Sequence, residues 1–352
     1  MAKVKIQGHA SGTGIITLTA PNTNTDRTIT LPDESITLSA GTTTLGGLTD
    51  VSMDITNFVD GLLIQPNSDG SAPTTGTLST ATGNVGIGKS TFAALTSGTY
   101  NTALGYNSLA ANTTGHSNTA IGKSALATNT TALSNTAIGL NALKLNTTGS
   151  QNTGVGRDAL FLNTTADDNT AIGRSALTSN TTGANNTAVG SSALYANTTA
   201  ANNTALGYNS LSANTTGVSN TAVGRGSLDA STTANYNTAL GDNAMTTNTT
   251  GSHQVAVGHA ALDANTTGGE NVAMGYHALS GNTTASNNTA IGHTALYVNT
   301  TGSENTSVGK ASLDANTTAS NQTAVGYNAL GATTTGAQNV AVGSQAMANN
   351  TT

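Results

Sequence analysis

The chain of 352 residues contains no cysteine and no tryptophan, and only 3% of its residues are aromatic and 7% charged. Without cysteine it forms no disulfide and no thiolate metal site, although this does not identify the compartment. So little charge and so few large side chains argue against an ordinary globular core, even though the length alone suggests two domains. Disorder is also disfavoured, because disordered chains are usually charged and lack periodic aliphatic residues.

Other absences restrict the partners. The net charge is −6 and no basic stripe is present, so we expect no nucleic-acid partner. No run approaches the roughly 18 apolar residues of a membrane span, so we expect no membrane insertion. Residues 1–8 lack the apolar stretch of a signal peptide, so secretion by the usual route is not expected either.

Proline is also scarce, and all four prolines precede residue 84. Residues 1–40 alternate like short strands punctuated by turn residues, and we expect a β-rich region there. Residues 41–83 are rich in glycine, serine and threonine and are expected to form a linker or neck, which holds one apolar patch at residues 58–64. Residues 84–352 lack proline, as expected where every strand donates hydrogen bonds to a ladder.

What fills residues 84–352 is a 17-residue unit repeated sixteen times without insertion, the last copy being incomplete. The consensus is Asn-Thr-Ala-Ile/Val-Gly-x-x-Ala-Leu-x-x-Asn-Thr-Thr-Gly/Ala-x-x. We number positions within the unit from Asn84 and call the residues that share a position a column. A strict short period predicts that each unit stacks on its neighbour, so the sequence predicts an all-β parallel β-roll or β-solenoid, a rod rather than a globule.

The columns indicate how one coil is built. Column four is always aliphatic and column nine is always large and apolar, so we expect both to be buried. Glycine fills column five in every copy, which predicts a corner with positive φ or a close backbone approach. We expect two short strands and two turns in each coil, with the second strand around the Ala-Leu pair. A helix is disfavoured by the recurring glycine, threonine and asparagine.

One thin coil buries too little to be stable by itself, so we expect association. Two buried aliphatic residues contribute about 1.5–3 kcal/mol each, whereas ordering 17 residues costs about 1.5 kcal/mol per residue. The small residues of columns three and eight are expected to form a flat face on which further chains pack closely. The sequence thus motivates an oligomer without fixing the number of chains.

Column six carries long polar and aromatic side chains and is therefore expected to face solvent. One interpretation is that it keeps a charge-poor surface soluble. The other is an exposed ladder that contacts receptor glycans, since tyrosine and arginine suit carbohydrate recognition. The candidate contact residues are Tyr106, Lys123, Arg157, Arg174, Tyr208, Arg225, His259, Tyr276, His293, Lys310 and Tyr327.

Other motifs are explained by the repeat. Residues 83–90 match the P-loop pattern, but Lys89 only occupies column six and no amphipathic helix follows, so no nucleotide site is expected. Four histidines between residues 253 and 293 fall in three columns, so they are not expected to converge on a metal. No Ser/His/Asp set or carboxylate pair stands out. We therefore expect no enzyme, no metal and no cofactor.

The Asn-Thr-Ala-Ile-Gly-x-x-Ala-Leu core resembles the repeats of trimeric adhesin heads, which are left-handed parallel β-rolls. The full unit is more similar to repeats in bacteriophage tail-fibre proteins. Residues 18–21 and 26–33 resemble the virion-proximal end of marine phage fibre proteins. This resemblance implies a homotrimeric virion fibre. Residues 1–40 would attach it to other virion proteins, and the roll would contact a host cell-surface glycan or protein.

Alternatives remain open at this point. A bacterial trimeric surface adhesin is one, but that family carries a signal peptide and a membrane anchor. A capsid decoration fibre and an ice-binding solenoid are others, although adjacent threonines should point to opposite sides rather than form one flat face. Related fibres often end in a chaperone domain, whereas the sixteenth copy stops after fourteen residues. An incomplete chain, a removed chaperone or a separate capping protein would each explain this. The sequence does not indicate host, receptor or tail versus capsid position.

Overall fold

A computed structural model describes residues 51–52, 58–59, 61–65, 75–77 and 79–351. The predicted virion-attachment region, residues 1–40, lies outside the described residues. The strands are β1 Val51–Ser52, β2 Phe58–Val59, β3 Leu62–Ile64, β4 Ala81–Thr82, β5 Val85–Ile87, β6 Thr102–Leu104, β7 Thr119–Ile121, β8 Thr136–Ile138, β9 Thr153–Val155, β10 Thr170–Ile172, β11 Thr187–Val189, β12 Thr204–Leu206, β13 Thr221–Val223, β14 Thr238–Leu240, β15 Val255–Val257, β16 Val272–Met274, β17 Thr289–Ile291, β18 Thr306–Val308, β19 Thr323–Val325 and β20 Val340–Val342.

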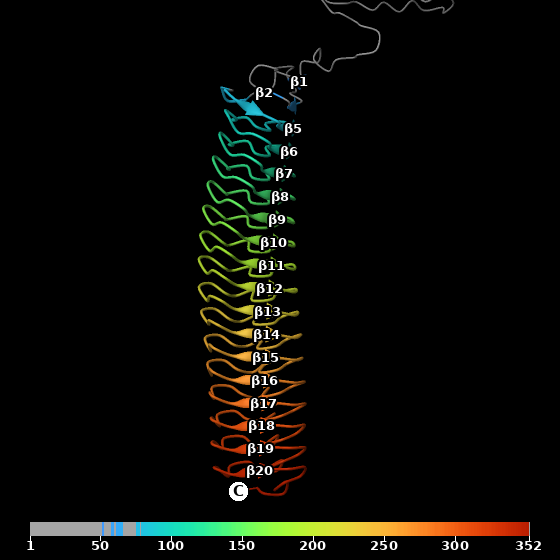
Figure 1. Cartoon of the computed structure of the whole chain (residues 1–352), viewed down its shortest axis with the longest axis vertical. Helices are drawn as coiled ribbons and strands as arrows, with labels where there is room; N and C mark the ends of the chain where they lie inside the picture. The colour runs from blue at the N-terminus through green and yellow to red at the C-terminus, as the bar shows by residue number, and fades with distance from the viewer. Residues whose placement is uncertain (1–50, 53–57, 60, 66–74, 78, 352) are drawn as a thin grey trace, which may run out of the picture.

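These strands form a parallel β-solenoid with 17-residue coils, and no helix occurs among the described residues. Figure 1 shows the coils stacked into a rod, with β5 to β20 one above another. Each strand pairs in parallel with the same residues of the next coil, for example Ala103 with Ala120. β3 pairs in parallel with β5 and so extends the same sheet before residue 84. β1 adds an antiparallel strand, and β2 and β4 form a separate parallel pair.

The glycine corner is confirmed. Each column-five glycine has φ between 127° and 144° and ends the strand. A Cβ atom on Gly122 would lie 2.4 Å from the carbonyl oxygen of Gly139 in the next coil. Only glycine meets both demands, a backbone region that L-residues avoid and contact with the neighbouring backbone.

The predicted second strand around Ala-Leu is wrong, because that segment is a run of turns. Asn107 and Leu109 have φ of 60° and 46°, which is left-handed rather than extended backbone. The segment still bonds from coil to coil, since Leu109 N–H donates to Ala125 O at 3.1 Å. The tight curvature needed to return the chain within 17 residues is therefore produced by left-handed residues, and the coil-to-coil hydrogen bonds offset part of their cost.

The core is built from columns three, eight and nine. The column-nine side chains from Phe92 to Leu330 are fully buried, as predicted, and alanine methyl groups of columns three and eight pack against them. Space beside column three is small. A Cβ on Gly154 would already lie 3.3 Å from Leu143 Cγ, and in the first coil the larger Phe92 is matched by Gly86.

Two expectations about the surface are wrong. Column four is not buried: Leu104, Leu206 and Leu240 are 45%, 47% and 47% exposed. The alanine columns lie inside the coil and offer no packing face to other chains. Side chains alternate along the strand, so column three points inward and columns two and four point outward. Column eight lies in the run of turns, where its alanines pack in the core beside column nine.

Two ladders of buried asparagine run along the rod, in columns one and twelve. In column one, Asn118 N–H donates to Asn101 Oδ1 at 3.0 Å, and Asn118 Nδ2 donates to Ala132 O at 2.9 Å. In column twelve, Asn129 Nδ2 donates to Asn112 Oδ1 at 2.9 Å. These bonds satisfy amide groups that would otherwise be costly to bury, and they fix the register of successive coils.

Candidate functional site

The structure places all eleven predicted contact residues of column six on the surface, one per coil, directly after the glycine corner. Tyr106, Tyr208 and Tyr276 are 50%, 55% and 49% exposed. Because the coils stack in register, side chains far apart in the sequence form one continuous row.

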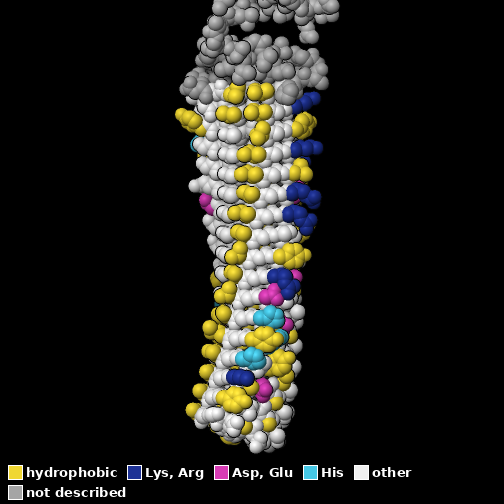
Figure 2. All heavy atoms as spheres, turned by 90° about the vertical axis from the view of Figure 1, so that its right-hand side faces the viewer, with side chains coloured by type: hydrophobic (Ala, Val, Ile, Leu, Met, Phe, Trp, Pro, Cys, Tyr) yellow, Lys and Arg dark blue, Asp and Glu magenta, His cyan; other side chains and the backbone are white. Residues whose placement is uncertain are grey.

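The row changes character along the rod. Figure 2 shows most lysine and arginine side chains of this face toward the β5 end, and histidine and acidic side chains toward the β20 end. In the second part Arg225 forms a bidentate pair with Asp242, with both contacts at 2.9 Å, and Asp242 also lies 3.6 Å from His259 Nε2. His259 of the preceding coil and His293 of the following coil both stack on the ring of Tyr276, with ring centroids 5.4 and 5.1 Å away. The faces of Tyr276 are thus occupied by protein.

A second surface feature is an exposed aliphatic stripe that sequence reasoning assigned to the core. Figure 2 shows an apolar band along the rod beside the charged row. We define the aliphatic stripe as column four: Ile87, Leu104, Ile121, Ile138, Val155, Ile172, Val189, Leu206, Val223, Leu240, Val257, Met274, Ile291, Val308, Val325 and Val342. Its members are half-buried or exposed throughout. Contiguous apolar surface of this extent is uncommon on a monomeric soluble protein and typically marks an interaction site.

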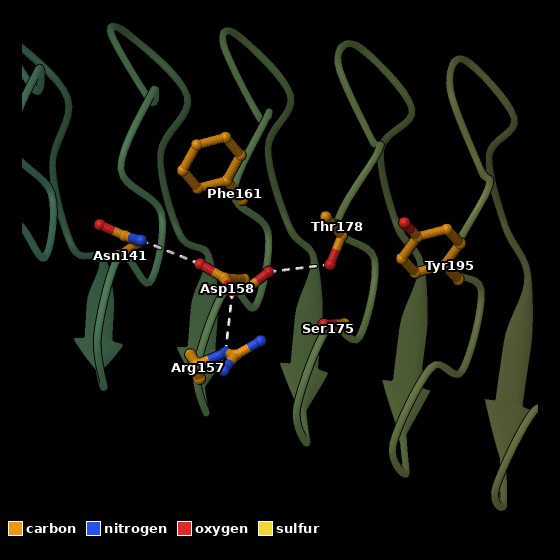
Figure 3. A pocket seen from close by; sticks show the side chains of 7 residues that line it. All are labelled: Asn141, Arg157, Asp158, Phe161, Ser175, Thr178 and Tyr195. Atoms are coloured by element: carbon orange, nitrogen blue, oxygen red, sulfur yellow. Dashed lines mark hydrogen bonds and ion pairs between the residues drawn. The ribbon is translucent and has the colours of Figure 1, made fainter.

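A third feature is a hollow of about 390 Å³ on the coils of β8 to β11. Figure 3 shows Asp158 in its middle, with Arg157 on one side and Phe161 on the other, and Tyr195 at its far end. Arg157 comes from the predicted row, but Phe161 and Tyr195 belong to column ten. The signal that sequence reasoning missed is that column ten varies as much as column six in these coils.

Two carboxyl groups have altered proton affinity. Burial raises the pKa of Asp263, an effect that the nearby His277 opposes most strongly among the lowering influences. Burial also raises the pKa of Asp314. His277 lies edge-on to both His259 and Tyr297, with ring centroids 5.5 and 5.9 Å away. These residues form a polar cluster beside the C-terminal part of the row.

The other sequence motifs build no evident site. Residues 83–90 form strand β5 and its glycine corner, with Lys89 exposed on column six. Within the described residues no group of three or more histidine, cysteine or acidic side chains is arranged to hold a metal ion. In the same part of the chain no helix is long and apolar enough to cross a membrane.

Comparison with known proteins adds no assignment: no family model, no curated protein and no solved structure matches this chain.

Proposed function

We propose that the protein is a non-enzymatic structural fibre whose rods associate along the aliphatic stripe and carry an exposed row of side chains to a host cell surface. The observation that carries this proposal is the uninterrupted stripe along one face of the rod. A rod of sixteen coils spaced by about 4.8 Å extends over roughly 75 Å. Such a shape provides reach and repeated surfaces rather than an enclosed reaction site.

The stripe provides enough apolar area for association. Its leucine and isoleucine members are 37–47% exposed where they are most accessible. Covering that fraction contributes roughly 0.5–1 kcal/mol per residue, or on the order of 10 kcal/mol from each chain. Association costs about 4–15 kcal/mol, so contributions from two or three chains outweigh it.

The partner that fits the stripe best is another copy of the same chain. Its side chains repeat at the strand spacing, and only a surface with the same repeat meets every coil in the same way. A closed homotrimer is the arrangement that the resemblance to adhesin heads and phage fibres implies. In this proposal the stripe takes the place of the alanine face as the contact between chains.

Attachment of the fibre to a virion is supported by the resemblance of residues 1–40 to virion-proximal ends of phage fibres. Three rods would present the column-six row three times and along their whole length. Weak single contacts then add through effective concentration, so a low affinity per site suffices for adhesion.

The assembly is tested by measuring the mass of the undenatured full chain by analytical ultracentrifugation. We expect a mass of three chains for the natural sequence and of one chain for the double variant Leu206→Asp, Leu240→Asp. Leu140→Asp is the matched control, because Leu140 is 41% exposed but lies in column six, off the stripe. A single-chain mass for the natural protein, or equal dissociation by Leu140→Asp, would reject the stripe as the chain contact.

The virion role is tested separately, by electron microscopy of phage particles labelled with antibodies against the solenoid. Label on tail appendages supports the proposal, whereas label on the capsid surface would identify a decoration fibre. Label on the host bacterium before infection, and none on particles, would instead identify a bacterial adhesin.

A further inference from the structure

The hollow on the coils of β8 to β11 combines aromatic, acidic, basic and hydroxyl side chains in one place (Figure 3). Its volume of about 390 Å³ lies at the lower end of the range of about 300–1,000 Å³ typical of small-molecule sites. The residues come from four successive coils, so the stacking of the solenoid brings them together.

We propose that this hollow binds one unit of a neutral hexopyranose saccharide. The inference rests on the proposed role in surface attachment and assigns a ligand class to one place on the rod. It also shifts the predicted contact from column six alone to the strip between columns six and ten.

The polar centre of the hollow is held in a fixed orientation. Asn141 Nδ2 donates to Asp158 Oδ1 at 3.0 Å, and Arg157 Nε donates to Asp158 Oδ2 at 3.1 Å. Thr178 Oγ1 donates to the backbone oxygen of Asp158 at 2.9 Å. The Asp158 side chain keeps 24% of its surface exposed, so its oxygens have acceptor capacity left for ligand hydroxyls.

Arg157 supplies the donors. Only its Nε contacts Asp158, and its side chain is 57% exposed. A guanidinium has five N–H groups, so the terminal ones are available to ligand oxygens. Neighbouring hydroxyls of a sugar both donate and accept, and they match a carboxylate and a guanidinium that lie side by side.

The aromatic rings supply an apolar platform. Tyr195 is 47% exposed, and its column neighbours Thr178 and Ser212 carry no ring. No ring in the described part of the chain stacks on Tyr195, unlike Tyr276, which lies between two histidines. Phe161 lies two coils away, a distance of roughly 10 Å. The C–H face of one pyranose ring can rest on Tyr195 while its hydroxyls reach Asp158.

Charge favours a neutral sugar over an acidic one. Arg157 is neutralised by its contact with Asp158. Among the described residues Arg157 is the only cation that lines the hollow. Arg174 follows it in column six of the next coil, and the ammonium of Lys144 lies over Phe161, 5.5 Å from the ring centroid. A sugar carboxylate placed in the hollow would meet the Asp158 carboxylate, and like charges at close range repel.

The test uses the full chain and nuclear magnetic resonance titration with methyl β-D-glucopyranoside, methyl β-D-galactopyranoside and methyl α-D-mannopyranoside. Methyl β-D-glucuronide is the charged comparison. We expect at least one neutral glycoside to bind with a millimolar Kd and more tightly than the glucuronide. Tyr195→Ala and Asp158→Asn should each weaken that binding about tenfold.

Tyr297→Ala is the matched control, because Tyr297 is an exposed tyrosine in the same column, six coils farther along. It should leave the Kd unchanged. No binding of any neutral glycoside, tighter binding of the glucuronide, or an equal loss in Tyr297→Ala would each overturn the proposal. Sedimentation of the same samples separates the two ideas: an assembled fibre without sugar binding rejects only the site, and a single chain that still binds sugar rejects only the assembly.

Discussion

Asn214 and Ser231 occupy column twelve in successive coils, and the asparagine ladder of that column is interrupted between them. Asn214 Nδ2 donates to Asn197 Oδ1 at 3.0 Å, as elsewhere in the ladder. Its own Oδ1 accepts from Gly217 N–H at 3.1 Å instead of from the next coil. Ser231 Oγ is buried without a hydrogen-bond partner.

Restoring the ladder should therefore stabilise the rod. Ser231→Asn places an amide where it can donate to Asn214 Oδ1 and accept from Asn248 Nδ2. Each new bond contributes about 0.5–1.5 kcal/mol, so we expect the thermal midpoint to rise. Asn180→Ser, which copies the interruption elsewhere, should lower it. Unchanged or lower stability in Ser231→Asn would show that the amide does not fit the space.

Gly190 in column five and Gly154 in column three differ in whether they tolerate alanine. Gly190 has φ of 136°, and a Cβ there would lie 2.3 Å from Gly207 O, so Gly190→Ala should lower the free energy of unfolding by about 1–3 kcal/mol. Gly154 stands in a column of alanines, and its Cβ would meet Leu143 Cγ at 3.3 Å. Gly154→Ala should stay within about 1 kcal/mol of the natural protein. Denaturant unfolding compares the two; equal losses would contradict the distinction.

The inward and outward positions of one coil can be compared directly. Leu177 is fully buried and Ile172, five residues earlier in the same coil, is 41% exposed. Leu177→Ala should lower the free energy of unfolding by about 2–5 kcal/mol. Ile172→Ala should cost much less when measured on single chains, dissociated by Leu206→Asp and Leu240→Asp. A larger cost of Ile172→Ala in the assembled protein than in single chains would support the stripe as the chain contact.

Asp263 should make the folded protein more stable as the pH falls, the opposite of the usual effect of a folded-state carboxylate. Burial raises its pKa above the ordinary 3.8, so the folded state takes up a proton at higher pH than the unfolded state. The stability contributed by this group is fully present below pH 3.8 and is lost as the pH rises through the raised pKa. Relative to Asp263→Asn, the natural protein should become more stable as the pH falls through that window. Thermal midpoints measured across the window test this, and parallel profiles of the two proteins would refute it.

The coil length follows from the strict 17-residue period. The buried column nine follows because every copy places a large apolar residue there. The glycine corner follows too, since no other residue occurs in column five. The orientation of the strand does not follow. In β6 Leu104 is more hydrophobic than Ala103, yet Ala103 is buried and Leu104 exposed, because the opposite wall leaves room only for a methyl group.

The backbone around Leu109 was also beyond prediction. A leucine with φ of 46° is rare, and neither propensity nor hydrophobic pattern signals it. The hollow beside Asp158 was not predicted either, because it forms where a turn replaces the expected second strand. With a turn in place of the expected second strand, column ten lies beside columns six and seven, so Tyr195 and Arg157 come to line one site although they are 38 residues apart.

The in-register asparagine ladders also allow the length of the rod to change in fixed steps. Every coil contacts its neighbours through the same atoms, so inserting or deleting a whole 17-residue unit changes the length by about one strand spacing and leaves every column aligned. Length can thus change in steps of roughly 4.8 Å without redesign of core, stripe or row. Loss of a single residue, by contrast, would shift every later side chain out of its column.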